Sequence, residues 1–223
     1  MLKIEKMNYW YQSKSEPLYH AIDLAFEAGK LYGILGSSGS GKTTFLSLIA
    51  GLDRPKTGDI YYNNESLKKI GLTNYRNQYV SIVFQSYNLL PYLSALDNIV
   101  AALEITNSQH KNRKTYAIDM LAKVGIDENL ARKNVQHLSG GQQQRVAIVR
   151  AMCCDAKLVV ADEPTGNLDE TNSREIIRLF TQLAHEQGKC VIVITHEKEI
   201  AYACDVILEL KEKKFTQVDK APN

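Results

Sequence analysis

Alternating apolar and polar positions in the first part of the chain predict β-strands. Residues 2–10 and 18–26 alternate in this way, and residues 58–62 and 79–84 indicate two more strands. Between these last two, an Asn-Asn pair at 63–64 predicts a turn, which a short helix follows. This part of the chain is therefore expected to be rich in sheet.

Apolar runs without alternation predict strands that are buried on both faces. Such runs occupy residues 30–35, 157–161 and 190–195. Helical spacing at 43–50 and 172–187 alternates with them, and a glycine follows each helix as a stop signal. The pattern predicts an α/β fold with a mixed, largely parallel core sheet and an antiparallel amino-terminal β-subdomain.

The middle of the chain has a different, helical pattern. Residues 96–124 have helical spacing that ends at a glycine, and a second helical stretch covers 139–154. Because no repeat or linker interrupts the chain, we expect one domain over 1–223. Its catalytic core would comprise 1–90 and 156–215, with a helical subdomain inserted at about 91–155.

A glycine-rich segment at residues 36–43, with the sequence GSSGSGKT, fills every fixed position of the phosphate-loop pattern G-x-x-x-x-G-K-[ST]. It lies between a predicted strand and a predicted helix, so backbone N–H groups and the helix N-terminus can hold phosphate. Lys42 would reach the outer phosphates and Thr43 would ligate Mg²⁺. A flexible Gly/Ser turn is the alternative. The residues predicted to bind the nucleotide here are Gly36, Ser37, Ser38, Gly39, Ser40, Gly41, Lys42, Thr43 and Thr44.

Two acids follow the buried strand at 157–161, at the sheet edge where ligands of open α/β sheets bind. We expect Asp162 to hold Mg²⁺ and Glu163 to act as general base toward an attacking water. The alternative, an acidic loop after a strand, is common. The phosphate loop in the same chain favours the catalytic interpretation.

The segment 138–142, with the sequence LSGGQ, predicts a second phosphate-binding helix start. Ser139 can cap the helix, and Gly140 and Gly141 expose backbone donors at its positive end. A serine-capped glycine turn without a ligand is the alternative.

The phosphate loop, the LSGGQ segment and the apolar strand that ends in Asp-Glu together closely resemble the ATP-binding subunit of ABC transporters. The resemblance covers about residues 2–210. It implies that Tyr11 stacks on adenine, with Tyr9 and Trp10 as rivals. It also implies that Gln85 senses γ-phosphate and Mg²⁺, and that His196 contacts γ-phosphate; the other four histidines are expected to be structural or surface residues.

The resemblance further implies a head-to-tail dimer with a second copy of the cassette. Each ATP would then lie between the phosphate loop of one copy and Ser139, Gly140, Gly141 and Gln142 of the other, while Asp169 lies in the loop that communicates across the dimer. The strings SGGQQQRVAI and ADEPTGNLD are similar to those of macrolide, lipoprotein-release and peptide-efflux systems. An integral membrane permease, driven toward export or mechanical extraction, is therefore the expected partner.

Composition limits the remaining possibilities. The net charge of +2 is small and dispersed, which argues against nucleic acid as a partner, and the basic clusters 111–114 and 211–214 are expected to be solvated loops or turns. No apolar run is long enough to span a membrane, and the first residues do not resemble a signal peptide. The four cysteines have no metal-binding spacing, so we expect reduced, buried thiols. The expected location is the cytoplasmic face of the plasma membrane, as a peripheral protein.

Three alternatives stay open at this point. The first is an ABC-type ATPase without transport, in DNA repair or on ribosomes. The second is an ATPase that regulates cell-wall hydrolases through a membrane protein. The third is a different phosphate-loop enzyme such as a small-molecule kinase. In addition, the Asp-Gly turn usual near the end of the family is replaced by residues 211–214, which leaves the final hairpin open.

Overall fold

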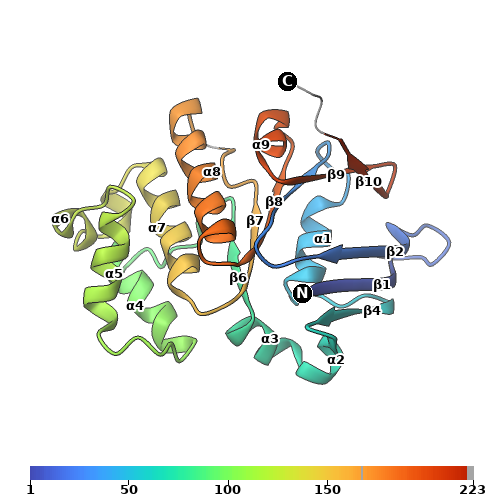
Figure 1. The fold of residues 1–223 in the computed structure, drawn as a ribbon, viewed down its shortest axis with the longest axis horizontal. Coiled ribbons are helices and arrows are strands. Elements are labelled where there is room, and N and C mark those ends of the chain that lie inside the picture. The colour runs from blue at the N-terminus through green and yellow to red at the C-terminus, as the bar shows by residue number, and fades with distance from the viewer. Residues whose placement is uncertain (167, 220–223) are drawn as a thin grey trace.

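The fold is built on two sheets (Figure 1). The structure is a computed structural model that describes residues 1–166 and 168–219. The smaller sheet is antiparallel and has the strand order β2-β1-β4-β5. Its strands are β1 (Leu2–Tyr9), β2 (Tyr19–Phe26), β4 (Thr57–Tyr62) and β5 (Glu65–Ser66).

The larger sheet has the order β10-β9-β3-β8-β7-β6, and all its strands are parallel except β10, which pairs antiparallel with β9. These strands are β3 (Leu31–Leu35), β6 (Val80–Val83), β7 (Leu158–Asp162), β8 (Cys190–Thr195), β9 (Val206–Lys211) and β10 (Lys214–Val218). The predicted α/β class, with a mixed core sheet and an antiparallel amino-terminal sheet, is confirmed. The subdomain boundaries stay a prediction.

Most of the helices form three groups around the sheets (Figure 1). Helix α1 lies between the antiparallel sheet and the parallel strands, α8 and α9 cover the opposite face, and α4 to α7 extend away from it. The helices are α1 (Lys42–Ile49), α2 (Leu67–Ile70), α3 (Leu72–Gln78), α4 (Ala95–Ile105), α5 (Arg113–Ala122), α6 (Glu128–Ala131), α7 (Gly140–Cys153), α8 (Glu170–His185) and α9 (Lys198–Ala203), with a 3₁₀ turn at Val135–His137.

The parallel sheet separates two apolar cores, because successive side chains of a strand point to opposite faces. In β7, Leu158 and Val160 pack with α1 and the antiparallel sheet, whereas Val159 and Ala161 pack with α7 and α8. All four side chains are fully buried. This arrangement explains why the sequence of β7 is continuously apolar, and it fixes the acidic residues that follow at the carboxyl edge of the sheet.

The helical stretch predicted at about 96–124 is confirmed as helical, but it forms two helices. It divides into α4 and α5, because Asn107 adopts a left-handed φ of 49° that ends α4. The Ser108 side chain is buried, and its carbonyl accepts a hydrogen bond from Arg113. The predicted helix at 172–187 also begins earlier, at Glu170, because the Asp169 carboxylate caps it.

The final hairpin, which the sequence left open, is formed. Its two turn residues, Glu212 and Lys213, both have left-handed φ values, of 48° and 64°. The predicted turn at 63–64, between β4 and β5, has the same shape, but there Asn63 and Asn64 occupy the left-handed positions. Asparagine tolerates this conformation better than glutamate or lysine. The β9–β10 turn is therefore strained by its residue types.

Replacing Glu212 by Asn and Lys213 by Gly is expected to raise the free energy of unfolding by about 1 kcal/mol. Asparagine and glycine adopt the left-handed φ of these two positions with less strain than glutamate and lysine. Urea denaturation measures the change. The converse variant, Asn64→Lys in the β4–β5 turn, is expected to lower stability. Equal or lower stability of the Asn-Gly variant would contradict the assignment of strain to this turn.

The four cysteines confirm the expectation of buried thiols. All four are buried thiols, and burial raises the pKa of Cys153 and of Cys190 to about 12. Their thiols therefore stay protonated and unreactive at neutral pH. Cys153 and Cys154, whose adjacency the sequence did not explain, end α7, and the Lys189 ammonium donates to the Cys154 carbonyl. Within the described residues, no helix has both the length and the apolar character needed to cross a membrane.

Candidate functional site

The phosphate loop connects β3 to α1 and has the shape that its glycines permit. Gly39 and Gly41 have φ values of 76° and 107°, which residues with a Cβ rarely adopt. Lys42 is 5% exposed, and its Nζ donates to the carbonyls of Gly36 and Ser37 at 2.8 and 2.9 Å. The lysine side chain thus folds back over its own loop. Oxygens of an outer phosphate would replace the two carbonyls as acceptors of its ammonium.

Tyr19 supports this loop, and the sequence analysis did not identify it. Its side chain is fully buried, and its hydroxyl donates to the Gly41 carbonyl at 2.6 Å. A Cβ on Gly41 would lie 2.8 Å from the same hydroxyl. The alternation of β2 shows only that Tyr19 faces the core. No sequence signal connects it with a loop more than twenty residues away.

Tyr19→Phe is expected to weaken ATP binding several-fold and to lower the free energy of unfolding by about 1 kcal/mol, since one buried hydrogen bond is lost at the loop. Nucleotide titration and urea denaturation measure the two effects. Tyr75→Phe is the matched control, because the buried Tyr75 hydroxyl donates to the Ile49 carbonyl at the far end of α1. It should lose similar stability but no ATP affinity. Unchanged ATP affinity of Tyr19→Phe would contradict the proposed support.

Asp162 ends β7 and has an unsatisfied carboxylate oxygen. Its Oδ1 is buried without a hydrogen-bond partner among the described residues. Burial raises the pKa of the carboxyl, and a hydrogen bond with Thr43 together with the Lys42 charge opposes that shift. An orphaned carboxylate oxygen beside a threonine hydroxyl provides hard oxygen ligands, which suit a divalent cation.

Glu163 is the centre of the site. Its backbone has a left-handed φ of 43° and its N–H donates to the Ile194 carbonyl, so β8 helps to hold this strained residue. The carboxylate oxygen Oε1 lies 3.8 Å from Lys42 Nζ and 3.2 Å from His196 Nδ1. Three residues that the sequence analysis placed in the site, from three separate segments, therefore meet in space.

Gln85 lies on the same side of the site. Gly166 has the side chains of Gln85 and Glu163 as neighbours: a Cβ built on it would lie 3.4 Å from Gln85 Nε2 and 3.8 Å from Glu163 Oε2. Because β6 and β7 are adjacent parallel strands, residues that follow their carboxyl ends reach the same edge. The structure thus brings Gln85 to the acidic pair.

Burial separates two of the three aromatic residues considered for adenine, Tyr9 and Tyr11, while Trp10 is half-buried. Tyr9 is 5% exposed, and its hydroxyl donates to Asp53, so it belongs to the core. Tyr11 is 66% exposed and its hydroxyl shares a hydrogen bond with Thr44 in the first turn of α1. An exposed ring beside the phosphate loop is available for stacking, and a buried one is not.

The LSGGQ segment forms the amino-terminal start of α7, as predicted. Ser139 and Gln142 form a reciprocal capping box, with Ser139 N–H to Gln142 Oε1 at 2.9 Å and Gln142 N–H to Ser139 Oγ at 3.3 Å. Among the described residues, no hydrogen bond or ion pair links residues 139–142 to the phosphate loop. Helices α1 and α7 pack on opposite faces of the parallel sheet (Figure 1).

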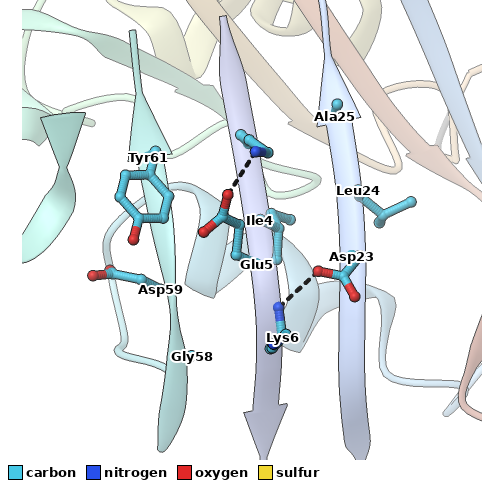
Figure 2. Close-up of a pocket in the computed structure, with 10 residues that line it drawn as sticks. Ile4, Glu5, Lys6, Asp23, Leu24, Ala25, Gly58, Asp59 and Tyr61 are labelled. Atoms are coloured by element: carbon cyan, nitrogen blue, oxygen red, sulfur yellow. Dashed lines mark hydrogen bonds and ion pairs between the residues drawn. The ribbon is translucent and has the colours of Figure 1, made fainter. Parts of the chain in front are cut away.

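One hollow of the described surface lies away from this site. It has a volume of about 690 Å³ and lies over the outer face of β1, β2 and β4 (Figure 2). In this hollow the Lys3 and Glu5 side chains form an ion pair, and the Asp23 carboxylate accepts a hydrogen bond from the backbone N–H of Lys6. The functional site is therefore defined by converging side chains and backbone donors, and not by cavity size.

A phosphate loop next to an acidic pair at the carboxyl edge of a largely parallel sheet defines a phosphate-loop nucleoside triphosphatase. The comparison with family models makes the class more specific. The model described as ABC transporter matches residues 19–166, and the chain belongs to this family as an ATP-binding, ATP-hydrolysing subunit.

Individual proteins agree with this assignment. The chain is 58% identical to the uncharacterized ABC transporter ATP-binding protein YclH of Bacillus subtilis (strain 168), over 97% of this chain and 96% of YclH. It is 40% identical to the macrolide export ATP-binding/permease protein MacB of Rhodopirellula baltica (strain DSM 10527 / NCIMB 13988 / SH1), over 88% of this chain and 29% of MacB. The dimeric structure of the bacterial ABC transporter cassette MJ0796 superposes with a TM-score of 0.89, at 32% identity, covering both chains completely.

Proposed function

We propose that two copies of this chain bind ATP between them, the phosphate loop of one copy facing residues 139–142 of the other. The chain carries both a phosphate loop and a capped helix start, and within the part of the chain that the structure describes no hydrogen bond joins the two. A two-fold pairing makes two equivalent sites. The dimeric structure of the related cassette MJ0796 supports this pairing.

The proposal that this site hydrolyses ATP rests on the convergence of Glu163 with Lys42 and His196. Glu163 accepts the proton of the attacking water through Oε1, as general base. His196 Nδ1, in the tautomer that carries a proton there, donates to the same oxygen and holds the carboxylate in position. When ATP binds, Lys42 exchanges its two carbonyl acceptors for phosphate oxygens. Its ammonium then moves away from Glu163 and pairs with the negative charge of the phosphate.

The remaining nucleotide contacts follow from the same geometry. Asp162, Thr43 and Gln85 would hold Mg²⁺, which supplies charge neutralisation of the phosphates when bound. The buried, unpartnered Oδ1 of Asp162 fits that cation. Tyr11 would stack on adenine, since it is the exposed aromatic residue in contact with α1. Asp169 would contact the partner copy.

We further propose that the subunit energises an integral membrane permease, in export or mechanical extraction, from the cytoplasmic face of the plasma membrane. MacB, which is named as a macrolide export ATP-binding/permease protein, is a relative in the branch that residues 139–148 and 161–169 resemble. Mechanical work would come from dimer closure on ATP and opening after hydrolysis.

The test is to purify the Glu163→Gln variant from membranes in the presence of ATP and Mg²⁺, where the slow variant should keep the closed complex. We expect an integral membrane protein to co-purify in a fixed ratio, and its identity to give the transport system. Lys42→Ala, which should not retain nucleotide, is the matched control and should lose the complex. Absence of any membrane protein from the Glu163→Gln preparation would overturn the transport proposal.

A further inference from the structure

A chain of hydrogen bonds connects the start of α8 with the first turns of α7. Asp169 accepts from the Asn172 backbone N–H at 2.9 Å and from Asn172 Nδ2 at 2.6 Å. Asn172 Oδ1 accepts in turn from the Arg145 guanidinium at 3.0 Å. We call Asp169, Asn172 and Arg145 the relay. It joins the residue predicted to face the partner copy with the helix that carries the LSGGQ segment.

The Asn172 amide also lies against the glycine of that segment. A Cβ on Gly141 would be 3.3 Å from Asn172 Oδ1, so the amide borders the backbone of Gly141 directly. Arg145 is one turn further along α7, three residues after Gln142. Asn172 is therefore in contact with the segment at Gly141, and bonded to the same helix at Arg145.

The relay spans an otherwise open gap. A cavity of about 600 Å³ lies between the end of α5, α7 and α8, and Arg145, Asn172, Glu175 and Arg178 line it. Buried apolar residues of both helices, such as Val149 of α7 and Phe180 of α8, belong to the same core cluster. At this end of the two helices, side by side in Figure 1, the polar bridge fixes their relative position.

Arg145 has two acceptors at this bridge, Asn172 and Glu175. Its side chain is only 16% exposed, and its Nε is buried without a partner among the described residues. The same terminal nitrogen that bonds Asn172 also lies 3.3 Å from a carboxylate oxygen of Glu175, which is 55% exposed. Because a buried guanidinium that loses an acceptor is costly, the arrangement favours one discrete geometry.

From these contacts we propose that Asn172 is a positioning residue, which holds the Asp169 turn and the Gly141 backbone as one rigid unit. Both would then meet the partner copy's nucleotide together, and movement at one would be transmitted to the other. The proposal rests on the proposed function, in which these two segments face the partner. Asn172 itself contacts neither nucleotide nor water in this scheme.

Asn172→Leu tests the coupling in the isolated, nucleotide-free chain. In this variant the Asp169 carboxylate still accepts from the backbone N–H of residue 172, so α8 should form. The side-chain hydrogen bonds of residue 172 with Asp169 and Arg145 are lost. We expect amide hydrogen exchange to become several-fold faster at Gln142 and Gln143, whose N–H groups bond Ser139 in the first turn of α7. Arg178→Gln, on the same cavity wall, is the matched control and should leave these amides unchanged. Faster exchange confined to the first turn of α8 would overturn the proposal.

The functional consequence is measured as ATP-driven dimerisation in the Glu163→Gln background. We expect Asn172→Leu to weaken dimerisation about tenfold, while ATP affinity of the single chain stays within twofold. Arg145→Met should weaken dimerisation to the same extent, and the double variant should lose no more than either single variant, as for residues that act together. Additive losses or unchanged dimerisation would overturn the proposal. If the Glu163→Gln parent itself stays monomeric with ATP, the proposed function fails, and hydrogen exchange alone then decides the coupling.

Discussion

Glu163→Gln is expected to reduce ATP turnover by roughly 10²- to 10⁴-fold, the usual contribution of a general base. Glutamine keeps the size and the hydrogen-bonding reach of glutamate but cannot accept the proton of the attacking water. The glutamine carbonyl can keep the contact with His196 Nδ1, which lies 3.2 Å from Oε1 of the glutamate. ATP affinity should therefore stay within a few-fold of the wild type, as measured by nucleotide titration beside phosphate release.

Two variants make this result specific. Glu186→Gln changes an exposed carboxylate at the end of α8 and should leave turnover unchanged. His196→Ala removes the group that holds Oε1, so it should reduce turnover less than Glu163→Gln if the histidine positions the base. Turnover of Glu163→Gln within tenfold of the wild type would remove Glu163 from the role of base.

Gly41→Ala is expected to weaken ATP binding by about 10- to 100-fold, with nucleotide titration as the measurement. A φ of 107° costs a residue with a Cβ about 1–3 kcal/mol. If ATP binding requires this loop shape, the cost is subtracted from the binding free energy, and each 1.4 kcal/mol lowers the affinity tenfold. In addition, the new methyl group would lie 2.8 Å from the Tyr19 hydroxyl, so the loop must move away from its support.

Gly39→Ala separates the two causes. Gly39 also has a positive φ, of 76°, but a Cβ there would have no atom within 4 Å, so only backbone strain remains. Its loss of affinity should be smaller than that of Gly41→Ala. Adding Tyr19→Phe to Gly41→Ala removes the clashing hydroxyl and should recover part of the affinity. A loss in Gly39→Ala as large as that in Gly41→Ala would contradict the steric explanation.

Local chemistry explains which features were predictable from sequence. The phosphate loop, the LSGGQ helix start and the acidic pair after β7 each depend on residues close together in the chain, through glycine φ values, a serine cap and a strand end. The resemblance to ABC cassettes then joined these motifs to Gln85 and His196, which as isolated residues carry no signal. The structure brings Gln85, Glu163 and His196 to one sheet edge because β6, β7 and β8 are neighbours.

Features that depend on competition between local preferences were harder to predict. Helical spacing continued through residues 96–124, but the left-handed Asn107 and the buried Ser108 divide the segment into α4 and α5. The β9–β10 turn forms at Glu212 and Lys213, although neither residue favours it, because β9 is held in the parallel sheet. Tertiary pairing thus overrides turn propensity at this position.

The sequence by itself determined the fold class, the nucleotide loop and the residue types that do chemistry, since these follow from periodicity and from motifs of a few contiguous residues. Only the tertiary structure decided which side chains support them: Tyr19 beneath Gly41, Asn172 beside Gly141, and Tyr11 rather than Tyr9 at the surface. These contacts join segments far apart in the chain or depend on burial. Hydrophobic packing of β-strands and helices creates both, and no local pattern encodes them.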